Sequence, residues 1–295
     1  MTVFETRLSA FLTQFEPLLA AQFPESASNR AVQAARYSVV AGGKRLRPYL
    51  VRAAARACGV TDDSWVWPAL AVEMIHTYSL IHDDLPAMDD DDLRRGQATC
   101  HRVYSEALAI LAGDGLQMQA VETLLSAPDD VLSAKQKLAM TQCLSSASGF
   151  HGMVGGQALD IDAEGKTISL DALHHMHELK TGALMTAAIE MGCLCQPDIT
   201  DAHLEKARSF GKHIGLAFQV VDDILDISGD TATLGKAQGA DAQHGKATYP
   251  ALLGLDGAKE YANALYELAI QRLDDWHSDT EELRALASFV LLRNR

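Results

Sequence analysis

The sequence has few aromatic residues and little strand-like alternation, which argues against an all-β fold. Aromatic residues make up 6% of the 295 residues, whereas apolar residues make up 48%, with abundant alanine and leucine. This composition suits packed helices. Apolar residues recur at three- and four-residue steps between Val3 and Phe15, as on one face of a helix. The sequence therefore predicts an all-α protein, and because no low-complexity linker divides the chain, we expect residues 1–295 to form a single domain.

A surplus of positive charge is also missing. The chain has 25 lysine and arginine residues against 39 aspartate and glutamate residues, a formal net charge of −14. Proteins that bind nucleic acid normally show a basic face or a high isoelectric point, so we do not expect a nucleic-acid partner. An anionic substrate would have to be attracted by local cations or by a bound metal, against the overall field.

Cysteine is scarce and unevenly placed, which argues against a disulfide framework. There are five cysteines, an odd number, and most are scattered along the chain. This favours a reducing compartment. Cys193 and Cys195 form a CxC pair with no second pair at zinc-ligand spacing, so we expect them to be buried thiols.

Long hydrophobic runs are absent as well. No segment reaches the ~18 uninterrupted apolar residues of a membrane span. The N-terminal segment carries charges within its apolar pattern and lacks the basic start of a signal peptide. We therefore expect a cytoplasmic protein without a membrane span.

A first buried helix is predicted from Pro68 to Asp84, where apolar residues occur on nearly every face. It ends in an acidic cluster, HDDLPAMDDDDLRRG, which Pro86 should separate from the helix so that the later aspartates curl back over the helix end. His76 and Asp83, seven residues apart, share one helical face. For residues 90–92 alone, a solvated run of charge is the favoured interpretation.

A second buried helix is predicted from about Ser209 to Ile227. Gln219, Asp222 and Asp226 form one stripe along it. Ionised carboxylates are costly to bury and repel one another, so both acidic clusters require a compensating cation. Carboxylate oxygens suit magnesium, which favours sites completed by substrate phosphates. The sequence therefore predicts a magnesium–diphosphate site between two facing helices.

Cations for such a site are found at several places. The segment GGKRLRP offers Lys44, Arg45 and Arg47 ahead of Pro48, a residue suited to the start of a helix whose dipole would also favour phosphate. This loop is a candidate diphosphate clamp.

Further basic residues follow the acidic cluster and lie in later loops. Arg94 and Arg95 could either pair with the neighbouring aspartates or grip phosphate oxygens. Lys180 lies in HELKTGAL, and Lys236 and Lys246 lie in a glycine-rich segment that fits a lid over a charged ligand.

Taken together, the segments GGKRLRP, DDLPAMD, GGQALD, KTG, QVVDDILD and GKATYP resemble the trans-prenyl diphosphate synthases, and among them the bacterial farnesyl diphosphate synthases most. The resemblance covers most of the chain. It implies an all-α isoprenoid-synthase bundle around a deep central cavity, a single polyprenyl synthetase domain, a homodimer, and Mg²⁺ as cofactor, with three ions when diphosphate is bound.

The resemblance also implies roles for individual residues. The implied magnesium ligands are Asp83, Asp84, Asp89, Asp222 and Asp226. The implied binding residues for isopentenyl diphosphate are Lys44, Arg47, His76 and Arg95. Those around the allylic diphosphate are Arg94, Lys180, Thr181, Gln219, Lys236 and Lys246. The implied catalytic set is Asp83, Asp84, Asp89, Lys180, Thr181, Gln219, Asp222 and Asp223.

The implied reaction condenses isopentenyl diphosphate with dimethylallyl and then geranyl diphosphate to give (2E,6E)-farnesyl diphosphate. Tyr78 and Ser79 are implied to limit product length, together with the four residues between Asp84 and Asp89. Five helical residues rise ~7.5 Å but also rotate ~140°, so geometry alone does not place Tyr78 beneath the growing chain. A geranylgeranyl diphosphate synthase and a non-catalytic regulatory subunit remain alternatives. A terpene cyclase is disfavoured, since cyclases usually lack the second acidic motif and the GGKRLRP loop.

Overall fold

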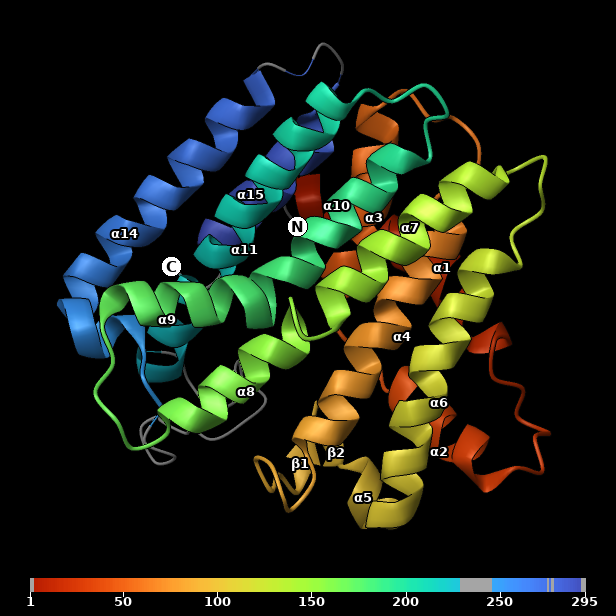
Figure 1. The fold of residues 1–295 in the computed structure, drawn as a ribbon, viewed down its shortest axis with the longest axis horizontal. Coiled ribbons are helices and arrows are strands. Elements are labelled where there is room, and N and C mark those ends of the chain that lie inside the picture. The colour runs from red at the N-terminus through yellow and green to blue at the C-terminus, as the bar shows by residue number, and fades with distance from the viewer. Residues whose placement is uncertain (1–2, 229–245, 275, 277–278, 293–295) are drawn as a thin grey trace. The chain divides into compact units, whose positions relative to one another are not determined.

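The computed structural model describes residues 3–228, 246–274, 276 and 279–292, and these are almost entirely helical (Figure 1). The only strands among them are two short ones, β1 (Leu93–Arg94) and β2 (Gln97–Ala98), which pair antiparallel. The prediction of an all-α protein is therefore confirmed. Lys236 lies outside the described residues. No described helix is long and apolar enough to cross a membrane.

The chain divides into two compact units, and each is described by itself. The first unit comprises Met1–Tyr49 and Asp63–Thr141, and the second comprises Leu50–Asp62 and Gln142–Arg295. The first acidic motif lies in the first unit, and the second acidic motif lies in the second unit. The expectation of one domain over the whole chain stays a prediction.

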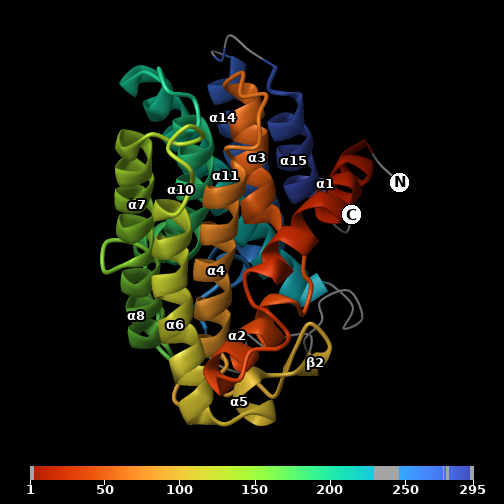
Figure 2. The same ribbon diagram turned by 90° about the vertical axis from the view of Figure 1, so that its right-hand side faces the viewer.

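The first unit is built on two long helices, α4 (Val66–Asp83) and α6 (Glu106–Leu125), which lie side by side in both ribbon views (Figure 2). The predicted helix from Pro68 to Asp84 is thus confirmed and begins two residues earlier. The remaining elements of this unit are α1 (Val3–Ala21), α2 (Arg30–Val39), α5 (Cys100–Val103), the hairpin, and the first parts of α3 (Leu46–Ala57) and α7 (Ala134–Ser148).

An aromatic cluster holds the N-terminal helix of the first unit in place. The rings of Phe11 and Phe15 stack at 5.1 Å, and Phe11 meets Tyr49 edge-on at 5.4 Å and Trp65 at 5.8 Å. All four side chains are fully buried. Buried aromatic rings contribute large apolar areas. This cluster therefore anchors α1, although the chain as a whole has few aromatic residues.

The second unit is organised around α11 (Asp201–Ser228), which packs against α10 (Ala183–Leu194) and α14 (Tyr249–Asp274). The predicted helix is confirmed, but it begins eight residues before Ser209. Residues 201–208 bury only Leu204 and Ala207, so this part is amphipathic rather than apolar on every face. The other elements are α8 (Met153–Ala163), α9 (Leu170–His177), the π-helix η1 (Glu178–Gly182), α15 (Glu281–Leu292) and the last parts of α3 and α7.

Candidate active site

The first acidic motif folds back on the end of its helix, as Pro86 predicted. Asp83 is the last residue of α4 and Asp84 follows as its C-cap. The backbone amide of Asp89 donates to the carbonyl of Asp83 at 2.9 Å, and that of Asp90 donates to Leu85 at 3.1 Å. The turn therefore returns Asp89 to the helix end that carries Asp83.

Asp84 is the most buried acid of this motif. Its carboxylate accepts a hydrogen bond from Arg94 Nε at 2.5 Å. Burial raises the pKa of Asp84 to about 6, with smaller contributions from the charges of Asp91 and Asp83, although Arg94 opposes the shift. The carboxyl group of Asp84 is therefore harder to ionise than that of a free aspartate, chiefly because it is buried.

The later acids behave as a solvated run of charge, the interpretation favoured from the sequence. Asp90 is exposed. Asp91 pairs with Arg94 at 3.3 Å, and the exposed Asp92 pairs with Arg102 at 3.0 Å. For Arg94 the structure therefore supports pairing with the neighbouring aspartates, and its grip on phosphate stays a prediction.

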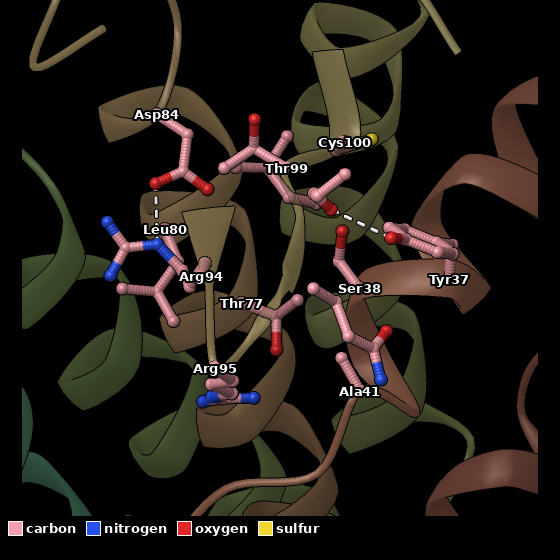
Figure 3. Close-up of a pocket in the computed structure, with 13 residues that line it drawn as sticks. Tyr37, Ser38, Ala41, Thr77, Leu80, Asp84, Arg94, Arg95, Thr99 and Cys100 are labelled. Atoms are coloured by element: carbon pink, nitrogen blue, oxygen red, sulfur yellow. Dashed lines mark hydrogen bonds and ion pairs between the residues drawn. The ribbon is translucent and has the colours of Figure 1, made fainter. Parts of the chain in front are cut away.

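A small pocket lies beside the first motif, between α2, α4 and the hairpin (Figure 3). Asp84 and Arg94 line one part of it and Arg95 another. Tyr37 also lines it and donates from its hydroxyl to the carbonyl of Ala98 at 2.7 Å, which ties α2 to the hairpin. The pocket thus combines an acid with two arginines next to the end of α4.

Three of the residues expected to bind isopentenyl diphosphate come together in the first unit. Arg47 Nη1 lies 3.4 Å from His76 Nε2. Arg95 donates to the carbonyl of Gly42. Burial, followed by the charges of Arg47 and Arg95, holds the pKa of His76 well below its usual value. At neutral pH the imidazole is therefore uncharged between arginines. Lys44, the fourth residue expected to bind isopentenyl diphosphate, is exposed in the GGKRLRP loop.

Gly43 allows this arrangement because it lacks a side chain. A Cβ at Gly43 would lie 2.6 Å from Arg95 Cζ, and the backbone there has a φ of +129°. Any other residue would be strained and would displace the guanidinium. The second glycine of GGKRLRP is thus explained by the close approach of Arg95.

Arg45 corrects the expectation of a three-cation clamp. Its side chain is fully buried and pairs with Glu73 at 2.7 Å and with Glu16 at 2.8 Å. These contacts join α1, α3 and α4. Arg45 is therefore a structural residue, because its donors are already used inside the unit. A further difference is that α3 begins at Leu46, so Pro48 lies within its first turn.

Tyr78 is buried in α4, with its ring 5.7 Å from that of His82. Burial and the charge of Asp83 raise the pKa of Tyr78 to about 12. Its hydroxyl has no hydrogen-bond partner among the described residues. Ser79, by contrast, donates to the carbonyl of His76 at 2.9 Å within its own helix. Tyr78 is thus a neutral, buried ring close to the first motif, while the role of both residues in product length stays a prediction.

A chain of hydrogen bonds runs through the second unit. Thr181 Oγ1 donates to Gln219 Oε1 at 2.8 Å, and Gln219 Nε2 donates to Asp223 Oδ1 at 2.9 Å. The other oxygen of Asp223 accepts from the backbone amide of Tyr249 at 3.0 Å. Both oxygens of the buried Asp223 thus accept hydrogen bonds, which fixes the orientation of the Gln219 amide.

Thr181 is presented by a π-helix, η1, which interrupts an otherwise continuous helical path from α9 to α10. Such bulges are rare and occur frequently at functional sites. Two glycines permit close packing around it: a Cβ at Gly156 would lie 2.2 Å from the Lys180 backbone nitrogen, and one at Gly215 would lie 2.9 Å from Gly182. The bulge is therefore held between α8 and α11.

Asp160 is a buried acid that contacts the expected site residue Lys180 and is not among the residues predicted from the motifs. It is buried in α8 and accepts a hydrogen bond from Lys180 Nζ at 2.5 Å. Although burial alone would raise the pKa of Asp160, the charges of Lys180 and Lys246 lower it overall. The signal was available in the segment GGQALD, whose acidic residue follows an apolar stretch. Asp160 thus orients Lys180 and lies within electrostatic range of Lys246.

The acids of the second acidic motif differ in burial. Asp222 is half-buried and Asp226 is buried, on the same helical stripe of α11 as Gln219. The prediction that Asp222 and Asp226 lie on one face with Gln219 agrees with this continuous helix.

The donor set of both motifs fits magnesium. Among the described residues, no three carboxylates approach within 4.8 Å of one another. Magnesium is typically bound by one or two carboxylates, with water and substrate phosphate completing its shell, so a preformed cage is not required. Burial disfavours the charged form of Asp84, and a bound cation would offset that cost.

Comparison with known proteins identifies the family. The polyprenyl synthetase family model matches residues 28–286. The chain belongs to the polyprenyl synthetase family. A farnesyl diphosphate synthase of Escherichia coli K12 is 52% identical over 267 residues, 90% of this chain and 89% of that protein. One from Haemophilus influenzae is 48% identical and covers 98% of both chains.

Solved structures of polyprenyl synthetases share the fold. A farnesyl/geranylfarnesyl diphosphate synthase from Zymomonas mobilis superposes with a TM-score of 0.86 at 38% identity, covering 97% of this chain and 98% of that one. A geranyltransferase from Helicobacter pylori, solved with magnesium and isoprenyl diphosphate, gives 0.83 at 32% identity and covers 99% and 97%. The all-α isoprenoid-synthase fold is thus confirmed.

Proposed function

We propose that this polyprenyl synthetase is a farnesyl diphosphate synthase. The observation that carries the proposal is the 52% identity, over nine-tenths of the chain, to a relative named farnesyl diphosphate synthase. The sequence keeps both acidic motifs, the GGKRLRP loop and the KTG segment. The enzyme would join isopentenyl diphosphate to dimethylallyl diphosphate and then to geranyl diphosphate.

The contacts of the first unit support a binding role for its cations. Arg47, His76 and Arg95 lie together and would hold the diphosphate of isopentenyl diphosphate with the exposed Lys44. A neutral imidazole can donate one hydrogen bond without adding to the charge already supplied by the arginines. Arginine is suited to bidentate contacts with phosphate oxygens.

The second unit would position the allylic substrate. Lys180, oriented by Asp160, would contact the allylic diphosphate with Lys246, and we assign Arg94 and Lys236 to the same group from family resemblance. Thr181 and Gln219 would direct oxygen dipoles toward the positive charge that develops when the allylic carbon–oxygen bond breaks. These groups are weak nucleophiles, so they would stabilise the cation without capturing it.

The reaction needs a metal as well as side-chain cations. We propose that Asp83, Asp84 and Asp89 of the first acidic motif and Asp222 and Asp226 of the second bind Mg²⁺, with three ions when diphosphate is present. Bound Mg²⁺ would supply positive charge to the leaving diphosphate. The bonding electrons leave with that diphosphate, the double bond of isopentenyl diphosphate attacks the allylic carbon, and the departing diphosphate takes the proton that is lost.

The hydrogen bonds of Asp223 change the role we assign to it. It was expected to be catalytic, but its two oxygens already accept from Gln219 and Tyr249. We therefore propose that Asp223 is a positioning residue for Gln219, whereas Asp222 is the metal ligand of this pair.

A geranylgeranyl diphosphate synthase is the second candidate, since a Capsicum annuum relative with that name is 44% identical over 89% of this chain. The lower identity and the buried Tyr78 beside the first motif favour the shorter product. A regulatory subunit is disfavoured because neither motif has lost its acids.

A homodimer, a cytoplasmic location and a single functional domain complete the proposal. Dimer formation is testable by sedimentation equilibrium, which should give twice the 31.8 kDa chain mass. A monomer at the concentrations of the activity assay would contradict it.

The ligand roles are tested by Asp222→Asn and Asp83→Asn, each compared with Asp92→Asn. The first two should abolish condensation while leaving the melting temperature within a few degrees of the original. Asp92 is exposed and paired only at the surface, so its variant should keep activity. Equal activity in all three would contradict the metal assignment.

A further inference from the structure

A second cluster of metal-ligating side chains lies in the second unit, outside the residues assigned to condensation. Cys58 follows α3, Cys193 lies on α10 and His203 lies in the first turn of α11. One ligand atom from each residue lies within 4.8 Å of the other two. These residues are 135 and 10 positions apart in sequence, so tertiary packing alone brings them together.

The spacing is close to that of a tetrahedral metal site. Cys58 Sγ lies 3.5 Å from His203 Nε2. Zinc bound through Zn–S bonds of about 2.3 Å and Zn–N bonds of about 2.0 Å places neighbouring ligand atoms roughly 3.5–3.8 Å apart. One edge of the cluster already has this length, and the other two are no longer than 4.8 Å.

The surroundings hold the three residues firmly. A Cβ at Gly192 would lie 2.3 Å from the carbonyl oxygen of Val51, so α10 and α3 are in direct backbone contact beside Cys193. Gln196 Nε2 donates to the carbonyl of Cys58 at 3.1 Å. The ring of Trp276 lies 4.6 Å from that of His203 and fixes its imidazole.

The cluster also has a route for a metal to enter. Cys193 is fully buried, whereas Cys58 and His203 are each partly exposed. Without a metal, the hydrogen bond between Cys193 and Cys58, together with burial, raises the pKa of the Cys193 thiol well above its usual value. The Cys193 side chain of the metal-free cluster is therefore a protonated thiol at neutral pH.

We infer that Cys58, Cys193 and His203 form a binding site for a thiophilic divalent cation, Zn²⁺, with a fourth position left to water. Two sulfur ligands and one imidazole suit zinc and do not suit magnesium, which requires oxygen. The site is separate from the proposed magnesium site, because the stretch of α11 between His203 and Asp222 spans ~28 Å. It would join three helices of the second unit and stabilise their packing.

Cobalt is a direct probe, because Co²⁺ bound by thiolates shows sulfur-to-metal charge transfer and tetrahedral Co²⁺ absorbs strongly in the visible. The full-length protein would be treated with chelator, kept reduced by a phosphine, and titrated with Co²⁺ in excess Mg²⁺. We expect both absorption features to saturate at one Co²⁺ per chain and to disappear when Zn²⁺ is added. Carboxylate-bound cobalt would not give the charge-transfer band.

Variants locate the site. Cys58→Ser, Cys193→Ser and His203→Gln should each weaken Co²⁺ binding at least tenfold. The control is Cys195→Ser, two positions from Cys193 and next to the end of the same helix, whose thiol donates to the carbonyl of Met191 at 3.5 Å. It should keep the spectrum. Circular dichroism checks that each variant is folded, and His203→Gln, at a partly exposed position, keeps the test valid if a cysteine variant unfolds.

Three results would overturn the inference. The first is the absence of a charge-transfer band in the reduced protein. The second is an unchanged spectrum in Cys193→Ser and His203→Gln. The third is equal loss of the spectrum in Cys195→Ser. A Cys58–Cys193 disulfide in the oxidised protein, found by mass spectrometry together with no cobalt binding after reduction, would identify a redox pair instead. Condensation activity in Mg²⁺ should be the same in Cys58→Ser and in the original protein.

Discussion

Replacing Asp223 with asparagine tests whether Asp223 positions Gln219 or instead binds the metal. In the structure both oxygens of Asp223 face N–H donors, the side-chain amide of Gln219 and the backbone amide of Tyr249. An asparagine has one oxygen and one NH₂ group, so it can accept from only one of these donors. The other donor then meets an N–H group in a buried place.

The expected cost follows from that mismatch. A buried donor left without an acceptor costs about 1–3 kcal/mol in the free energy of unfolding. Taking roughly 2–4 °C per kcal/mol for a chain of this size class, the melting temperature should fall by several degrees. Calorimetry or a thermal melt followed by circular dichroism measures the change.

Activity should fall for a related reason. In the Asp223→Asn variant, the Gln219 amide loses the carboxylate oxygen that orients it, so its own oxygen is no longer held where it accepts from Thr181. The dipole directed at the allylic carbon would then lose its fixed orientation. If this orientation contributes about 1.4 kcal/mol to transition-state stabilisation, kcat falls about tenfold with little change in the KM for either diphosphate.

Asp222→Asn is the matched control, one position away on the same helix. Because Asp222 is half-buried and is proposed to bind Mg²⁺, its variant should lose activity by more than tenfold without a comparable fall in melting temperature. The reasoning is refuted if Asp223→Asn keeps the original melting temperature and recovers activity at high Mg²⁺, since Asp223 would then itself be a ligand.

Three further predictions follow from the contacts of single residues. Arg45→Ala should lower the free energy of unfolding by about 3–5 kcal/mol, because it leaves the buried Glu73 uncompensated. Lys44→Ala should change that free energy by less than about 0.5 kcal/mol and instead raise the KM for isopentenyl diphosphate. Urea titration and steady-state kinetics distinguish the two variants, and equal stability of both would contradict the role of Arg45. Asp160→Asn should lower the free energy of unfolding by about 1–3 kcal/mol at pH values above the ordinary aspartate pKa of about 3.9. Because the folded-state pKa of Asp160 is lowered, the stability that its carboxylate contributes is lost as the pH falls below about 3.9 and through the folded-state pKa. A stability difference between the variant and the original protein that persists at lower pH would contradict this role of Asp160. Tyr78→Ala should lengthen the product, measured by chromatography of dephosphorylated radiolabelled alcohols, and an unchanged chain-length profile would refute this role.

Much of the helical framework could be predicted from hydrophobic periodicity. The helix from Pro68 to Asp84 was found within two residues, because α4 is apolar on nearly every face. The start of α11 was missed by eight residues, because its first two turns bury only Leu204 and Ala207. The prediction relied on apolar residues on every face of the helix, and this pattern is absent from the amphipathic first turns of α11.

Motifs identify candidate site residues, but the contacts of those residues could not be predicted from the sequence. Arg45 and Lys44 are neighbours of the same charge, yet Arg45 is fully buried and Lys44 is exposed. The difference depends on Glu73, 28 positions away, which the local sequence does not indicate. Similarly, adjacent Asp222 and Asp223 differ because only Asp223 meets the amide of Tyr249.

Tertiary contacts also decide the roles of the cysteines. None of the five cysteines, all of which lie in the described part of the chain, forms a disulfide. The CxC spacing drew attention to Cys195 as the partner of Cys193. The structure instead places Cys58 and His203 beside Cys193, since helical geometry directs residues two apart toward different faces.

Product analysis tests the central claim most directly. The purified protein would be incubated with Mg²⁺, isopentenyl diphosphate and dimethylallyl diphosphate, and the dephosphorylated products separated by chain length. We expect a fifteen-carbon alcohol that is lost on adding a chelator and restored by Mg²⁺. Failure to condense the two diphosphates, with both still bound, would contradict it.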